Sequence, residues 1–134
     1  MVFFGYSLAR APYVQMGVVD AEGQLVHSFD PGVTVPSMMH DFAITDKYSI
    51  LMDLPLRFDP KRGPQGKAML QFDPTAESRF AIFSRHCTSQ EDIKWFTAPP
   101  CYVFHTANAW EHDNKVAHGA FLESFQLLLK LNCK

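Results

Sequence analysis

The chain has 134 residues, of which 47% are hydrophobic and 13% aromatic, and its formal net charge at pH 7 is −2. This length suffices for one modest domain, and the composition is typical of a globular protein. The near-neutral charge provides no basic field for phosphates, so we expect no nucleic-acid partner. No stretch approaches the roughly 18 apolar residues of a membrane helix, so we expect no integral membrane segment.

The cysteines and the first residues bear on the cellular compartment. Cys87, Cys101 and Cys133 are too few for a closed disulfide framework, and they include no Cys-x-x-Cys pair typical of zinc sites. The apolar start has no basic region before it and stops at Arg10 and Pro12, too early for a signal peptide. We therefore expect a reducing, cytoplasmic location, with a plastid possible for a full-length parent.

Short apolar segments alternate with turns rich in Gly, Pro and Asp along most of the chain. Three hairpins are predicted, with strands at residues 13–19 and 24–29, 42–45 and 48–52, and 68–72 and 79–83. Two further strands are predicted at 93–96 and 101–105, and another begins at Lys115. About nine short strands at regular spacing indicate an all-β fold. The pattern alone leaves a sandwich, a barrel and a propeller of two to three blades open.

The last segment departs from this pattern. Apolar residues recur at helical spacing between Phe121 and Leu129, and residues 126–131 form a dense apolar run without a turn signal. Two interpretations stay open: a closing helix, or a strand sequence interrupted in the middle of a fold.

Histidines are the candidate metal ligands of this chain. None are spaced for a helical chelate, and from spacing alone each is more often a surface or hydrogen-bonded side chain than a ligand. His40 and His105 differ from the others, because each follows apolar residues and precedes a short polar stretch. A ligand at the inner end of a strand would occupy such a position. The six histidines are His27, His40, His86, His105, His112 and His118.

The blocks around these two histidines carry a resemblance to a known family. They are Met-Met-His-Asp-Phe at 38–42 and Phe-His-Thr-Ala-Asn-Ala-Trp at 104–110. Between them lie Asp-Leu-Pro-Leu at 53–56 and Arg-Phe-Ala-Ile-Phe-Ser-Arg at 79–85, which has Ala and Ser where the family usually has Gly and Pro. In these motifs and their order, the chain resembles the carotenoid cleavage oxygenases, also described as carotenoid/stilbene dioxygenases.

The resemblance implies a domain organisation. Residues 1–125 are expected to form part of the family's seven-bladed β-propeller, in about two to three blades. Residues 126–134 are expected to be a divergent C-terminal tail. The chain is thus expected to be a partial one.

The resemblance also implies a chemistry. Members of the family hold Fe(II) on four histidines at the propeller axis and use O₂ to split a conjugated C=C bond into two carbonyl products. Neutral imidazoles suit iron, and four of them leave positions open for O₂. His40 and His105 are expected to be two of these metal ligands, with no catalytic residue beyond the ligands. The expected substrate is an apolar polyene or a stilbene-like molecule.

Side chains near the two histidines have less certain roles. Asp41 and Glu111 lie in the same segments, but neighbours in a strand point to opposite faces, so neither is assigned as a partner of an imidazole ring. Phe42, Phe104 and Trp110 could line a tunnel for an apolar substrate, or could equally be ordinary blade core.

Three hypotheses of function follow from the sequence. The first is a non-haem Fe(II) dioxygenase that acts on a carotenoid, an apocarotenoid or a stilbene. The second is a catalytically inactive, truncated or degenerate fragment without stable iron binding, because half the ligands cannot form the usual site. The third is a small metal-free β-rich binding module, which has only the general β pattern in its favour.

Overall fold

The described part of the chain is built almost entirely from antiparallel β-strands. The computed structural model describes residues 1–113, 115–121 and 126–132. Its strands are β1 (Val2–Tyr6), β2 (Val14–Val19), β3 (Leu25–Phe29), β4 (Ala43–Ile44), β5 (Tyr48–Asp53), β6 (Leu56–Phe58), β7 (Leu70–Phe72), β8 (Ser78–Ser84), β9 (Lys94–Ala98), β10 (His105–His112), β11 (Lys115–Phe121) and β12 (Gln126–Asn132). Two short 3₁₀ helices, η1 (Pro60–Gln65) and η2 (Gln90–Asp92), lie in the connections. The all-β prediction is confirmed.

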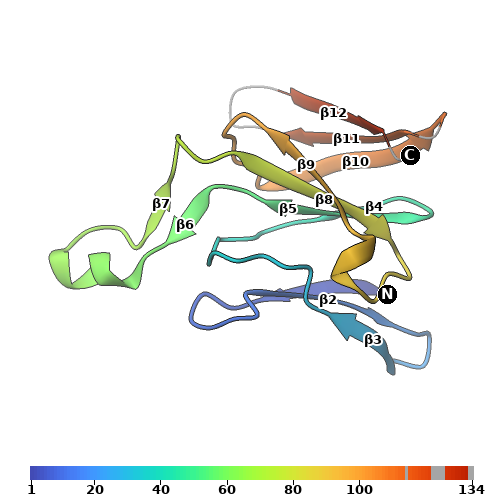
Figure 1. The fold of residues 1–134 in the computed structure, drawn as a ribbon, viewed down its shortest axis with the longest axis horizontal. Coiled ribbons are helices and arrows are strands. Elements are labelled where there is room, and N and C mark those ends of the chain that lie inside the picture. Colours follow the sequence, from blue (N-terminus) through green and yellow to red (C-terminus); the bar gives the residue numbers. More distant parts are fainter. Residues whose placement is uncertain (114, 122–125, 133–134) are drawn as a thin grey trace.

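Three sheets are stacked in the order of the sequence (Figure 1). The first has the strand order β1-β2-β3, the central one β4-β5-β8-β9, and the third β10-β11-β12. The hairpin of β6 and β7, with η1 at its tip, projects from one end of this stack (Figure 1). The successive sheets agree with the predicted two to three blades.

The first sheet contains the first predicted hairpin. Asp20 accepts a hydrogen bond from the Gln24 backbone (2.8 Å), and Gly23 adopts a positive φ of 81°, which glycine tolerates best. The strand β1 was not predicted, although it pairs with β2 along its whole length, from Val2 opposite Val18 to Tyr6 opposite Val14.

Gly17 in β2 gives a first testable prediction. A Cβ atom at this position would lie 2.5 Å from the Phe3 ring and 3.1 Å from the His27 carbonyl oxygen, whereas one at Gly5 would meet nothing within 4 Å. Gly17→Ala is therefore expected to lower the free energy of unfolding by about 1–3 kcal/mol. Gly5→Ala, the matched control, should leave it unchanged or raise it by up to about 1 kcal/mol. Urea unfolding of both variants checks this, and equal effects would contradict it.

The central sheet is buried on both faces. Ile50, Leu51, Ala81 and Ile82 in β5 and β8 are at most 2% exposed. Successive side chains of a strand point to opposite faces, so these strands need apolar residues at consecutive positions rather than at alternate ones. This explains the continuous apolar runs in their sequences.

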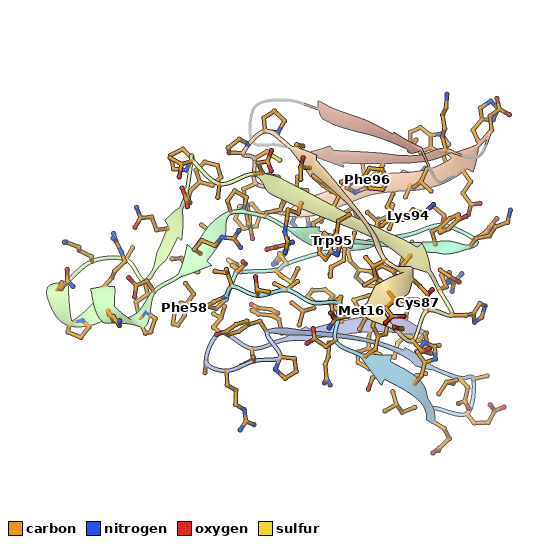
Figure 2. All side chains as sticks on the ribbon, viewed as in Figure 1. Met16, Phe58, Cys87, Lys94, Trp95 and Phe96 are labelled. Carbon is orange, nitrogen blue, oxygen red and sulfur yellow. The ribbon has the colours of Figure 1, made fainter. Side chains whose placement is uncertain are left out.

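The edge strand β9 shows the same alternation (Figure 2). Trp95 packs with Met16 and Cys87 in the core between the first and central sheets. Its neighbour Phe96 packs in a different core, with Ile82 and with Val116 of the third sheet. Each face of the central sheet therefore carries a separate hydrophobic core, and the three sheets are fixed to one another through these cores.

The third predicted hairpin is wrong in its pairing. Both of its segments contain strands, β7 and β8, but these strands do not pair with each other. β7 pairs with β6, and β8 pairs with β5 along residues 48–53. The reason is the turn at η1, where Asp59 caps the 3₁₀ helix and Gly66 (φ 68°) ends it, so that the chain folds back onto β6. β8 is then left to complete the buried central sheet.

The third sheet corrects two further predictions. The strand expected at residues 101–105 begins instead at His105 and runs to His112. The helical interpretation of the last segment is wrong for residues 126–132, which form β12 and pair with β11 from Phe121 opposite Gln126 onward. β11 provides hydrogen-bond partners for the backbone of this apolar run. These hydrogen bonds outweigh the helical spacing of the apolar residues in the run. Among the described residues, no helix is long and apolar enough to cross a membrane.

Candidate metal-binding site

The structure brings His40 and His105 together, although 65 positions separate them in the sequence. Their ring centres lie 5.0 Å apart, and the ring planes meet at 79°. His40 lies in the connection that precedes β4, and His105 is the first residue of β10. Both residues are exposed at the surface of this chain.

A buried residue just before each histidine anchors it. Met39 is 4% exposed and belongs to the core between the first and central sheets. Val103 is 1% exposed and packs with Met52 and Phe80 on the central sheet. The apolar residues before the two histidines, noted in the sequence, therefore fix the backbone while the imidazoles remain outside the cores.

Aromatic side chains extend from the pair on one side. Phe104 contacts His40 edge-on, with ring centres 5.7 Å apart, and Tyr102 contacts Phe104 at 4.7 Å. Burial raises the pKa of Tyr102, so its hydroxyl stays neutral at physiological pH. Phe104 is 40% exposed and Trp110 is 42% exposed, whereas Phe42 packs against Phe4 at the first core. Only Phe104 therefore combines exposure with contact to the pair.

The geometry of the two imidazoles suits a shared metal ion. With metal–nitrogen bonds of about 2.1 Å, two imidazoles at neighbouring positions on one metal have ring centres roughly 5 Å apart. The observed 5.0 Å agrees with this spacing, and with the 79° between the ring planes it is also the geometry of an edge-on aromatic contact. Within the described residues, however, no group of three or more His, Cys, Asp or Glu side chains could hold a metal. If these two imidazoles bound a metal, they would supply only part of its coordination sphere.

Two carboxylates connect the segments that carry the histidines. Asp41 Oδ2 accepts hydrogen bonds from the Thr106 backbone N–H (2.8 Å) and hydroxyl (2.9 Å). Glu111 Oε1 accepts from the Thr45 hydroxyl (2.7 Å) and from the Lys47 backbone N–H (2.9 Å). The Thr45 hydrogen bond is the main reason that the pKa of Glu111 is lowered, so this carboxylate is ionised at neutral pH.

A buried ion network lies directly behind the His40 segment. Asp53 is 2% exposed; its Oδ2 accepts from Arg79 Nε (2.9 Å) and Nη2 (2.6 Å), and its Oδ1 from Arg57 Nη1 (2.9 Å). Ser37, three residues before His40, donates to the same Oδ1 (3.2 Å). The Arg79 guanidinium in turn lies 4.4 Å from the centre of the Trp95 ring. Asp53 and Arg79 belong to the sequence motifs noted above, and the structure gives them this structural role.

His112 and His118 have surroundings unlike those of the pair. His112 is exposed and pairs with Asp113, as expected for a solvated turn. His118, to which the sequence assigned no role, is fully buried near Phe80, and neither ring nitrogen has a hydrogen-bond partner among the described residues. Burial lowers the pKa of His118, and the charge of Asp41 offsets this only in part.

His118 gives a prediction on pH dependence. In the unfolded chain its pKa is about 6.5, so below that pH the unfolded state binds a proton that the folded state excludes. The free energy of unfolding should therefore fall as the pH is lowered from 7.5 to 5.5, by at most about 1.4 kcal/mol per pH unit from this group. His118→Leu should reduce the decline and His112→Ala should not, as measured by urea unfolding at each pH. An identical decline of the free energy of unfolding in the wild type, His118→Leu and His112→Ala would contradict this account.

Sequence reasoning missed Thr106, Thr45 and Ser37 as parts of the site. Hydroxyl residues at such positions carry no pattern of their own, and their partners lie 65, 66 and 16 positions away. The available signal was the pair of acidic residues, Asp41 and Glu111, placed in two otherwise apolar and aromatic segments.

Comparison with known proteins identifies the family. The family model described as retinal pigment epithelial membrane protein matches residues 1–131. Carotenoid 9,10(9',10')-cleavage dioxygenase 1 of Pisum sativum is 43% identical over 117 residues, covering 87% of this chain and 21% of that protein. The Arabidopsis thaliana protein of the same name is 42% identical, with 87% and 22% covered. The chain thus spans about a fifth of the length of these relatives.

The solved structures agree with the sequence relatives. The crystal structure of Pseudomonas brassicacearum lignostilbene dioxygenase superimposes with a TM-score of 0.70 and 29% identity, covering 80% of this chain and 22% of that one. The fold is therefore part of a β-propeller, as expected, and the three sheets are its blades. With the family model matching nearly its whole length and its motifs placed around one pair of histidines, the chain belongs to the carotenoid cleavage dioxygenase family.

Proposed function

We propose that this chain supplies two histidine ligands, His40 and His105, to the Fe(II) site of a dioxygenase that cleaves a conjugated C=C bond. The observation that supports the proposal is the arrangement of the two exposed imidazoles, 5.0 Å apart and steeply inclined. The remaining ligands would come from parts of a complete enzyme that this chain does not contain. Iron bound there would supply the chemistry that activates O₂.

The residues of this chain would have three tasks. His40 and His105 would bind the metal through ring nitrogens, as neutral imidazoles suit iron. Phe104, which contacts His40 and is exposed, would offer an apolar surface beside the metal. The cores behind Met39 and Val103 would keep the backbone of both ligands rigid.

The proposed substrate is a carotenoid, an apocarotenoid or a stilbene-like molecule, cleaved with O₂ into two carbonyl products. The names of the relatives support this class, since they include carotenoid cleavage and lignostilbene dioxygenases. An exposed Phe104 beside the metal ligands fits an apolar conjugated substrate.

A second candidate is that this chain by itself is catalytically inactive and holds no iron stably. Two observations favour it: the described residues include no group of three or more His, Cys, Asp or Glu side chains that could hold a metal, and the chain spans about a fifth of the length of its relatives. The sheets also present edge strands, such as β9 and β12, that are open to pairing.

A chimera distinguishes the two candidates. The 117-residue stretch of this chain that matches the Pisum sativum relative would replace the corresponding segment of that relative. Iron content and cleavage of a carotenoid would be measured beside the isolated 134-residue chain. We expect the chimera to bind iron in a one-to-one ratio and to cleave the substrate, and the isolated chain to do neither. A chimera that melts cooperatively like its parent but holds no iron would contradict the proposed ligands.

A further inference from the structure

Both oxygens of the Asp41 carboxylate accept hydrogen bonds, and among the described residues none of the donors is an imidazole. Its Oδ1 accepts a hydrogen bond from the Phe42 backbone N–H (2.8 Å), and its Oδ2 accepts both donors of Thr106. Asp41 follows His40 directly, and Thr106 follows His105 directly. The residues that follow the two histidines therefore connect the two histidine segments by hydrogen bonds.

This connection joins separate sheets. The His40 segment leads into β4 of the central sheet, whereas His105 opens β10 of the third sheet. A hydrogen bond across such a boundary restricts how the two sheets slide and rotate against each other at that end. Both imidazoles are exposed, so the packing of the buried cores acts on their backbone and not on the rings themselves.

A second connection runs in the opposite direction. Glu111, at the far end of β10, accepts hydrogen bonds from the hydroxyl of Thr45 and the backbone of Lys47, in the turn after β4. Each of the two segments thus contributes one carboxylate that is held by the other segment. Hydrogen bonds at two separate points fix both the distance and the relative orientation of β4 and β10. Hydrogen bonds at a single point would let the two strands pivot about it.

We propose that Asp41 is a positioning residue: through Thr106 it sets the separation of His40 and His105, and Glu111 stabilises the same alignment. This role rests on the proposed function, because the proposed metal site is what requires a defined spacing of the two rings. It acts through the backbone, so it requires no contact between the carboxylate and a ring. Because neighbouring side chains in a strand point to opposite faces, Asp41 is not assigned as a partner of the His40 ring. That argument does not apply to a role that acts through the backbone.

The chain contains a matched control. Asp73 Oδ1 accepts hydrogen bonds from the Thr75 backbone (2.9 Å) and hydroxyl (2.6 Å), the same donors that Asp41 receives from Thr106. This second pair lies in the turn between β7 and β8, where the chain leaves the projecting hairpin. Thr75→Val therefore removes the same kind of hydrogen bond as Thr106→Val without touching the histidine segments.

The first measurement needs no metal. In the 134-residue chain, nuclear Overhauser effects between the imidazole protons of His40 and His105 report directly on ring proximity. We expect them in the wild-type chain and in Thr75→Val, expect them to weaken at least about twofold in Thr106→Val and Asp41→Ala, and expect Thr106→Ser to restore them. Thr106→Val keeps the backbone donor and is conservative, so it serves if Asp41→Ala fails to fold. Undiminished effects in Thr106→Val, or their absence in the wild type, would overturn the inference.

The second measurement separates this inference from the proposed function. Titration of the chimera and its Thr106→Val and Thr75→Val variants with Ni²⁺ alone, monitored by calorimetry, should show about tenfold weaker binding in Thr106→Val than in the unaltered chimera or in Thr75→Val. Weaker binding without a change in the ring contacts would overturn the positioning role. If the ring contacts depend on Thr106 but the chimera binds no metal at these histidines, the positioning stands and the proposed function fails.

Discussion

Replacing His40 or His105 by alanine in the chimera is expected to abolish carotenoid cleavage and to remove most of the bound iron. Loss of a residue that only orients a metal-bound histidine typically lowers metal affinity 10–100-fold. Loss of a ligand should exceed this, so we expect a fall of more than about 100-fold in both iron affinity and cleavage rate. Iron content by metal analysis and product formation by chromatography are the two measurements.

His112→Ala is the matched control for these variants. His112 lies on the same strand as His105, but its side chain is 80% exposed and pairs with Asp113 at the surface. This variant should retain the iron content and the cleavage rate of the unaltered chimera. If His40→Ala or His105→Ala kept near-full activity, that residue would not be a ligand.

Asp53→Ala is expected to cause the largest loss of stability, about 3 kcal/mol or more in the free energy of unfolding. The carboxylate is 2% exposed and is shared by Arg57 and Arg79, whose side chains are 21% and 33% exposed. Removing one member of a buried ion network leaves uncompensated charges, which costs about 3–5 kcal/mol, and the partial exposure of the arginines favours the lower end. Urea unfolding at pH 7.5 gives the value.

Lys47→Ala provides the comparison for an exposed pair. The Lys47 ammonium lies 3.6 Å from Glu111 Oε2, and its side chain is 77% exposed. Such a pair contributes at most about 1 kcal/mol, so this variant should unfold almost like the wild type. Similar losses for Asp53→Ala and Lys47→Ala would show that the Asp53 network does not stabilise the fold.

The positions of the strands were predicted better from the sequence than their pairing. Short apolar segments between turn signals located β2 to β5, β8 and β9 within a few positions, because burial and turn chemistry are local. The pairing of β7 with β6 depends on a 3₁₀ turn with a proline start, Pro60, and a left-handed Gly66, which resembles an ordinary loop in the sequence. The strand β12 was ambiguous because the same apolar run satisfies a helical period and an edge strand.

For the candidate site, too, the residues could be predicted but the contacts between them could not. His40 and His105 were selected by the motifs around them, and their proximity in the structure agrees with that selection without testing them as ligands. The contacts that connect them could not be read from the sequence, because each joins residues more than 60 positions apart. The boundary at residue 125 between the domain and a divergent tail stays a prediction, and the family model extends to residue 131.

The most direct test of the central claim is a crystal structure of the iron-loaded chimera with anomalous diffraction recorded at the iron edge. The account predicts one anomalous peak bound by ring nitrogens of both His40 and His105, at about 2.1 Å from each. A peak coordinated by other residues, with either of these imidazoles turned away from it, would contradict the account.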